Sequence, residues 1–286
     1  MTPTIRNVTV LGTGVLGSQI AFQTALHGFA VTAYDISDEA LDGARERLET
    51  LAGTYAEEVP LAADGKAEET RDAITLSSDL AESVKDADLI IEAVPEVLKI
   101  KQETYQKLAE VAPEKTIFAT NSSTLLPSDI KDSTGRPDKF LALHFANRIW
   151  DFNTAEVMGT TETDSDVFDA VVQFAKDIGM VPIELHKEKA GYVLNTLLVP
   201  FLKAAAELAQ GGYAEPEAVD TTWRIATGAP LGPFQIFDII GLTTPYNIFS
   251  NGSPDEKKFA EWLKTEYIDK GKMGVASGEG FYTYSE

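Results

Sequence analysis

The sequence predicts an α/β protein, in which a doubly wound and mostly parallel sheet is followed by a smaller all-helical C-terminal domain. Two observations carry this prediction. Up to about residue 158, short apolar runs alternate with helical patterns, which is typical of a sheet covered by helices on both faces. After about residue 188, the patterns are helical and no strand is convincing. The expected domains are residues 1–188 and residues 189–286.

The first elements have clear local signals. Residues 5–11 alternate and are rich in valine, which indicates a strand. Residues 16–27 have apolar positions at helical spacing, and His27 with Gly28 forms a typical helix end. Residues 29–34 predict a second strand, and Ser37 begins the next helix with an N-cap side chain. A charged, alanine-rich helical excursion follows, with a loop near residues 60–65.

The remaining elements follow from length and apolar pattern. Residues 88–94 form a nearly continuous apolar run, as expected of a parallel strand buried on both faces. Other strands are expected at residues 73–76, 117–120, 140–145 and 155–158. Other helices are expected at residues 79–84, 100–111, 193–208, 216–227 and 257–267.

The composition excludes several classes of protein. Lys and Arg number 24 against 45 Asp and Glu, and a net charge of -21 disfavours binding to nucleic acid or to anionic membranes. Without cysteine, neither a disulfide framework nor thiol catalysis is possible. No apolar run is long enough for a membrane span, and the first residues lack a secretory pattern, so we expect a cytoplasmic protein.

A glycine motif follows the first strand and opens the first helix. Gly12, Gly14 and Gly17 give the G-x-G-x-x-G pattern, and Leu16 lies within it. Gly12 allows the tight turn, Gly14 lets the backbone approach a pyrophosphate, and Gly17 allows close packing of helix on strand. The helix N-terminus offers free N–H groups to the phosphates. This context predicts a Rossmann dinucleotide-binding domain.

Asp35 ends the second strand and lies 18 residues after Gly17, near the expected interval. A carboxylate there accepts hydrogen bonds from ribose hydroxyls and repels a 2′-phosphate. Ile36 and Ser37 offer no arginine for that phosphate, so the sequence predicts NAD as the cofactor. The alternative is that Asp35 is only a turn or cap residue.

Three histidines are available as a general base for hydride chemistry. His27 is at a helix end and His186 is among charged residues, so we assign them to a cap and to the surface. His144 lies at the carboxyl end of an apolar strand, where open α/β sheets bind ligands. The alternative for His144 is a core histidine with a satisfied hydrogen bond.

Three other polar sites are candidates. Glu156 has apolar neighbours, where a carboxylate requires a partner. Ser123 lies in a polar cluster, residues 121–124, directly after a strand. The alternative is that this cluster caps a helix. Asn195 is on an apolar helix of the second domain and needs a buried partner. We find no spacing of histidines and carboxylates that predicts a metal site.

These residues resemble the L-3-hydroxyacyl-CoA dehydrogenases, of the 6-phosphogluconate-dehydrogenase-like superfamily, along nearly the whole chain. The resemblance lies in the glycine loop with Asp35 and in residues 92–96 with Lys99 and Lys101, 120–125, 144–147, 156–158, 191–195, 231–234, 238–242 and 278–282. It implies an NAD-dependent enzyme of fatty acid metabolism that interconverts a 3-hydroxyacyl-CoA and its 3-ketoacyl-CoA. It also implies a homodimer formed through the helical domain.

The resemblance assigns roles to single residues. His144 would be the general acid and base, and Glu156 its orienting partner. Ser123 would bind the reacting oxygen near the nicotinamide, and Asn195 would contact the substrate oxygen. The nicotinamide-ribose side would be lined by Glu96, Lys101 and Asn147.

Departures from the family pattern affect the substrate. Arg148 replaces the usual proline after His-Phe-x-Asn, and a guanidinium favours a carboxylate ligand, so Arg148 is a candidate substrate contact. The usual lysine-rich CoA-binding stretch is acidic here, with Glu57, Glu58, Asp64, Glu68 and Glu69 against Arg45, Arg47, Lys66 and Arg71. Three hypotheses therefore remain: an NAD-dependent 3-hydroxyacyl-CoA dehydrogenase, the same chemistry on a small free hydroxy acid, and a non-catalytic dinucleotide sensor. Chain-length preference and physiological direction are left open.

Overall fold

The computed structural model describes residues 3–284, which form two compact units that divide between Val193 and Leu194. The first unit contains an eight-stranded sheet in the order β3-β2-β1-β4-β5-β6-β7-β8. Its strands are β1 (Asn7–Leu11), β2 (Ala30–Tyr34), β3 (Thr75–Ser77), β4 (Leu89–Glu92), β5 (Ile117–Thr120), β6 (Phe140–Phe145), β7 (Thr154–Gly159) and β8 (Val181–Leu185). This order and the helices around it confirm the predicted α/β fold class.

The strands run parallel from β3 to β6, and the direction changes once. β7 pairs antiparallel with β6, and β8 pairs parallel with β7. The sequence pattern does not indicate this reversal, because apolar periodicity carries no strand direction. The reversal of strand direction nevertheless brings two of the candidate residues together, because the antiparallel register places His144 directly opposite Glu156.

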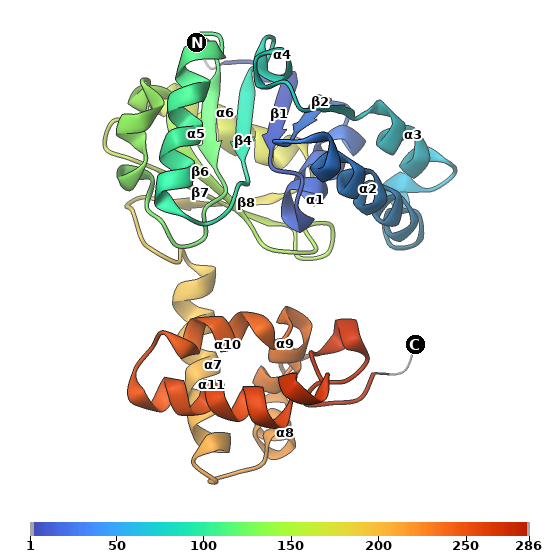
Figure 1. Cartoon of the computed structure of the whole chain (residues 1–286), viewed down its shortest axis with the longest axis vertical. Coiled ribbons are helices and arrows are strands. Elements are labelled where there is room, and N and C mark those ends of the chain that lie inside the picture. Colours follow the sequence, from blue (N-terminus) through green and yellow to red (C-terminus); the bar gives the residue numbers. More distant parts are fainter. Residues whose placement is uncertain (1–2, 285–286) are drawn as a thin grey trace. The chain divides into compact units, whose positions relative to one another are not determined.

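Six helices of the first unit cover the two faces of the sheet. They are α1 (Val15–Leu26), α2 (Asp38–Glu58), α3 (Lys66–Ala73), α4 (Leu80–Val84), α5 (Leu98–Val111) and α6 (Ser165–Asp177). Side chains of β1 and β4 alternate between two cores: Val10 and Ile91 join α1, α2 and α6, whereas Leu11 and Ile90 join α4 and α5. Figure 1 shows α5 and α6 on opposite sides of the strands.

Local signals explain where the first helices begin and end. The α1 helix starts directly after Gly14 and ends at His27, followed by Gly28 with a φ of 88°. Ser37 caps α2, since its side chain accepts a hydrogen bond from the backbone N–H of Ala40. These ends agree with the predicted caps, because cap chemistry is local in sequence.

The second unit is helical. Its helices are α7 (Leu194–Gln210), α8 (Pro216–Thr227), α9 (Pro233–Ile240), α10 (Thr243–Ser250) and α11 (Pro254–Glu266). Its core is aromatic, centred on Phe234, Phe237 and Phe259. Two buried carboxylates tie distant segments to it: Asp220 accepts the backbone N–H of Phe234, and Asp238 accepts that of Phe281.

No helix in the described part of the chain combines the length and the apolar character that crossing a membrane requires.

Candidate active site

The glycine loop connects the carboxyl end of β1 to the start of α1, as predicted. Gly12 has a φ of 90°, which favours glycine. A Cβ atom at Gly17 would lie 1.9 Å from the carbonyl oxygen of Gly12, so only glycine lets α1 pack this closely on the loop. A Cβ atom at Gly14 would meet nothing within 4 Å. Leu16 is half-buried and packs against the main core.

Asp35, at the end of β2, lies beside this loop. One of its oxygens, Oδ2, accepts hydrogen bonds from the backbone N–H and the hydroxyl of Thr13, at 2.8 and 2.7 Å. Arg47 of α2 donates to the carbonyl oxygen of Thr13 at 2.8 Å. Thr13 and Arg47 therefore brace the loop, a role that the glycine spacing does not reveal.

These observations fit a dinucleotide. A Cβ atom at Gly14 would have open space around it, and Gly14 lies at the N-terminus of α1, where backbone N–H groups attract phosphate. The hydrogen bond from Thr13 holds Asp35 next to this loop. The carboxylate of Asp35 would repel a 2′-phosphate. The loop, the helix end and the carboxylate could together hold a pyrophosphate and a ribose.

The polar cluster after β5 is anchored by Glu96. One carboxylate oxygen of Glu96 accepts hydrogen bonds from the Ser122 hydroxyl at 2.6 Å and from the backbone N–H groups of Ser123 and Thr124 at 3.0 and 2.8 Å. Burial raises the pKa of Glu96, but the bonds from Ser122 and Thr124 and the charge of Lys101 outweigh it and lower that pKa to about 2. Glu96 is therefore ionised and holds the backbone that presents Ser123.

Beneath Glu96 lies a buried ion pair. Lys101 of α5 is 1% exposed, and its ammonium group lies 2.5 Å from Glu92 at the end of β4 and 3.4 Å from Glu96. The hydroxyl of Thr120 donates to the second oxygen of Glu92 at 2.8 Å. Burial raises the pKa of Glu92 despite the positive charge of Lys101. Lys101 therefore links the ends of β4 and β5 to the Ser123 segment, and sequence spacing does not indicate Glu92 as its partner.

His144 and Glu156 meet across β6 and β7. They are directly opposite in the antiparallel register, and both are nearly inaccessible, at 4% and 3% exposure. The imidazole Nδ1 lies 2.9 Å from a Glu156 oxygen, and Nε2 lies 3.0 Å from the hydroxyl oxygen of Ser123. Because a cross-strand pair shares one face of the sheet, the register alone brings these side chains together. The imidazole is thus placed between a carboxylate and a hydroxyl.

Tyr192 completes the surroundings of His144, although the sequence analysis assigned no role to it. Its ring lies parallel to the imidazole, with centroids 4.5 Å apart and planes 13° apart. Its hydroxyl donates to the carbonyl oxygen of Ser122 at 2.7 Å. An aromatic residue between a glycine and an apolar helix is most often a core residue, so sequence offers little signal for this position.

The other predicted residues lie elsewhere or are engaged. Asn147 is exposed, after the end of β6. Arg148 has a φ of 59°, and its guanidinium donates to Glu58 at 3.0 Å and to Asp151 at 3.3 Å. Asn195 lies in the first turn of α7, in the helical unit.

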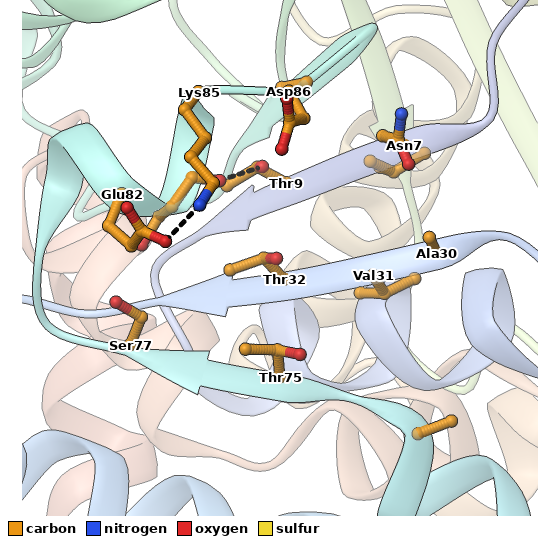
Figure 2. A pocket seen from close by; sticks show the side chains of 14 residues that line it. Asn7, Thr9, Ala30, Val31, Thr32, Thr75, Ser77, Glu82, Lys85 and Asp86 are labelled. Atoms are coloured by element: carbon orange, nitrogen blue, oxygen red, sulfur yellow. Dashed lines mark hydrogen bonds and ion pairs between the residues drawn. The ribbon is translucent and has the colours of Figure 1, made fainter.

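The hollow drawn in Figure 2 lies away from these groups. It is formed over β1, β2 and β3, where Thr9, Thr32 and Thr75 are paired across the strands. Its ion pair, Lys85 with Glu82, is exposed. None of the fourteen lining residues belongs to the glycine loop or to the His144 cluster. It therefore has no part in the candidate active site.

Comparison with known proteins gives matches over nearly the whole chain. Residues 7–189 match the model of the 3-hydroxyacyl-CoA dehydrogenase NAD binding domain, and residues 191–284 match the model of the 3-hydroxyacyl-CoA dehydrogenase C-terminal domain. A mitochondrial hydroxyacyl-coenzyme A dehydrogenase of Rattus norvegicus is 36% identical over 98% of this chain and 91% of its own length. A probable 3-hydroxybutyryl-CoA dehydrogenase of Bacillus subtilis is 32% identical over 99% of this chain and 98% of its own length.

Two solved structures are informative. A diketoreductase, described for its substrate-directed dual catalysis of dicarbonyl compounds, is 68% identical, with a TM-score of 0.96 over 98% of this chain and 99% of its own. The (S)-3-hydroxybutyryl-CoA dehydrogenase of Ralstonia eutropha is 27% identical, with a TM-score of 0.82 over 99% of this chain and 100% of its own.

Proposed function

The chain belongs to the 3-hydroxyacyl-CoA dehydrogenase family of NAD-dependent oxidoreductases, and on that premise we propose that it interconverts a 3-hydroxyacyl compound and its 3-keto counterpart with His144 as the acid and base. The observation that supports this role is the placement of one buried imidazole between Glu156 and Ser123. A dinucleotide sensor would need only the glycine loop and Asp35, so it would leave this cluster without a purpose.

NAD would be held by the glycine loop, with its pyrophosphate at Gly14 and the N-terminus of α1 and its ribose hydroxyls at Asp35. When bound, it supplies the acceptor or donor of hydride. Glu96 and Lys101 are proposed to shape the nicotinamide-ribose side through the segment that presents Ser123, and Asn147 is proposed to contact the same side.

The proton chemistry follows from the hydrogen bonds of His144. With Nδ1 donating to Glu156, Nε2 keeps its lone pair and faces the Ser123 hydroxyl. In the oxidation direction, Nε2 takes the proton of the substrate hydroxyl, and Glu156 stabilises the imidazolium that forms. In reduction, Nε2 returns that proton to the carbonyl oxygen. Ser123 would turn its hydroxyl toward the same oxygen, and Asn195 is proposed to bind it as well.

The substrate is either a CoA thioester, as in the family name, or a free carbonyl compound. Two observations favour the free compound. The 68% identical diketoreductase acts on dicarbonyl compounds. In addition, residues 38–73 contain eleven acidic and four basic side chains. The four basic side chains are engaged by neighbours: Arg45 by Asp42, Arg47 by the carbonyl of Thr13, Lys66 by Glu69, and Arg71 by Glu49 and Asp72.

The phosphates of CoA need cations or helix N-termini, and an acidic surface with its cations occupied repels them. We therefore propose a free 3-keto acid or a free dicarbonyl compound as the preferred substrate, with Arg148 as a candidate contact for a carboxylate. Arg148 would first have to leave Glu58 and Asp151, both partly exposed partners.

The experiment is NADH oxidation with a matched pair of substrates, acetoacetyl-CoA and acetoacetate, together with a free dicarbonyl compound. We expect a higher kcat/KM for the free compounds. A kcat/KM at least tenfold higher for acetoacetyl-CoA would restore the thioester as the preferred substrate. A lack of turnover with every member of the panel would contradict the proposed chemistry.

We also propose a homodimer formed through the helical domain, residues 189–286. Large apolar side chains are exposed on several of its helices: Leu197 at 69%, Ile225 at 80% and Ile248 at 52%. A second copy of the chain that covered these side chains would remove their apolar surface from water. Light scattering after gel filtration should give twice the chain mass, and Ile225→Glu should shift it toward the monomer.

A further inference from the structure

Tyr192 has a left-handed backbone conformation, which a residue with a bulky side chain rarely adopts. Its φ is 52°, directly after Gly191 with a φ of 80°. Bulky residues rarely adopt the left-handed region, and they remain there only where the surroundings hold them. The side chain is 1% exposed and packs against Ala142 and Met158 in a small core beside β6 and β7. The fold therefore fixes this ring in one place at the cost of backbone strain.

The contacts of Tyr192 and its neighbour reach three members of the proposed machinery. The ring stacks on the imidazole of His144, with centroids 4.5 Å apart. The hydroxyl holds the carbonyl oxygen of Ser122, next to Ser123. The backbone N–H of Val193 donates to the Glu156 oxygen that does not face His144, at 2.9 Å. One dipeptide therefore touches the imidazole, its carboxylate and the segment that carries its hydroxyl partner.

The imidazole of His144 is constrained at both nitrogens and on one face. The imidazole turns about its Cβ–Cγ bond, and the hydrogen bonds from its two nitrogens to Glu156 and Ser123 resist a small turn only weakly, because hydrogen-bond angles bend at little cost. A flat ring parallel to the imidazole, with planes 13° apart, resists that rotation because any tilt drives atoms into van der Waals overlap.

We propose that Tyr192 is a positioning residue for His144, which fixes the plane of the imidazole so that Nε2 points at the substrate oxygen. The inference rests on the proposed role of His144 as acid and base. Tyr192 does not touch the reacting atoms in this account. Its face also offers a favourable electrostatic contact to the imidazolium that forms during oxidation, as aromatic faces do for cations.

The test compares Tyr192→Leu, which removes the flat ring, with Tyr192→Phe, which keeps the ring and removes only the hydroxyl. A displacement of about 1 Å in a reacting group costs on the order of 10²-fold in rate. We expect Tyr192→Leu to lower kcat by about 10- to 100-fold, with the Kd for NADH unchanged. Tyr192→Phe should recover most of that loss.

A spectroscopic measurement makes the test independent of activity. The chain has three histidines, so imidazole resonances are assignable with His27→Gln and His186→Gln as references. In the unmodified protein, the ring current of Tyr192 should shift the His144 resonances upfield. The shift should persist in Tyr192→Phe and vanish in Tyr192→Leu. This measurement on the unmodified protein remains available if the leucine variant fails to fold.

Two results would overturn the inference. One is an unshifted His144 resonance in the unmodified protein. The other is a folded Tyr192→Leu variant with the kcat of the unmodified enzyme, while His144→Ala has lost activity. If His144→Ala itself retains full turnover, the proposed acid and base has failed instead, and the two failures are thereby distinguished.

Discussion

Two alanine substitutions in the glycine loop should have opposite effects on folding and on cofactor binding. Gly14 has a φ of -62°, and a Cβ atom there meets nothing within 4 Å, so alanine fits the protein without strain. Gly17 has no such room, because its Cβ atom would lie 1.9 Å from the carbonyl oxygen of Gly12. The same added methyl group therefore enters open space at one position and protein backbone at the other.

The magnitudes follow from where the methyl group goes. Overpacking of a close-packed site costs about 1–3 kcal/mol. For Gly17→Ala this cost falls on the folded protein, and at about 2–4 °C per kcal/mol it lowers Tm by roughly 2–12 °C. For Gly14→Ala the cost falls on the complex with NAD, where the pyrophosphate approaches the backbone. The same energy there weakens binding by about 5- to 150-fold.

The assays are thermal unfolding without cofactor and titration of NADH fluorescence. Gly14→Ala should keep the Tm of the unmodified protein and lose affinity for NADH. Gly17→Ala should lower the Tm of the protein in the absence of cofactor. Unchanged NADH affinity in Gly14→Ala would refute the placement of the pyrophosphate at this loop.

Three further predictions concern the carboxylates and the buried lysine. Glu156→Gln removes the charged hydrogen-bond partner of His144, which is a loss of about 1.5–3 kcal/mol. In steady-state assays, kcat should therefore fall by roughly 10- to 150-fold, and the KM for NADH should not change. Glu96 has a folded-state pKa lowered to about 2, so its ionised form stabilises the fold above its ordinary pKa. Denaturant unfolding gives the difference in unfolding free energy between the unmodified protein and Glu96→Gln. This difference should be constant above pH 5 and shrink as the pH falls from about 4.5 toward 2. A difference that grows on acidification would contradict the lowered pKa of Glu96. Lys101→Met leaves the buried carboxylate of Glu92 without its cation and should lower the free energy of unfolding by about 3–5 kcal/mol, measured by thermal unfolding. The control is Lys99→Met on the same helix, where the side chain is 84% exposed and the free energy of unfolding should hardly change.

The sequence was sufficient for the order of elements up to β7, because each carries a local signal. Caps, the glycine loop and the apolar run before Glu92 are all readable from neighbouring residues. The α6 helix, β8 and, in the second unit, α9 and α10 were not predicted. Residues 181–185 are only partly buried and include Pro182, so they lack the apolar run by which an inner strand is recognised. They form an edge strand, which is stabilised by its pairing with β7 rather than by its own composition.

The candidate site was predictable as a set of residue types but not as a set of contacts. His144 and Glu156 were selected from strand ends and apolar flanks, whereas their contact depends on the antiparallel register of β6 and β7. The contact of Tyr192 with His144 spans 48 positions of sequence, and one of the two carboxylate partners of Arg148, Glu58, lies 90 positions away. Such pairs result from the folded topology, and a single sequence contains no local trace of them.

The most direct test of the account is the turnover of His144→Ala with a carbonyl substrate that the unmodified enzyme reduces, measured at saturating NADH. Loss of a positioned acid should lower kcat by about 10²- to 10⁴-fold while NADH still binds with its normal Kd. A kcat close to that of the unmodified enzyme would contradict the assignment of proton transfer to this imidazole.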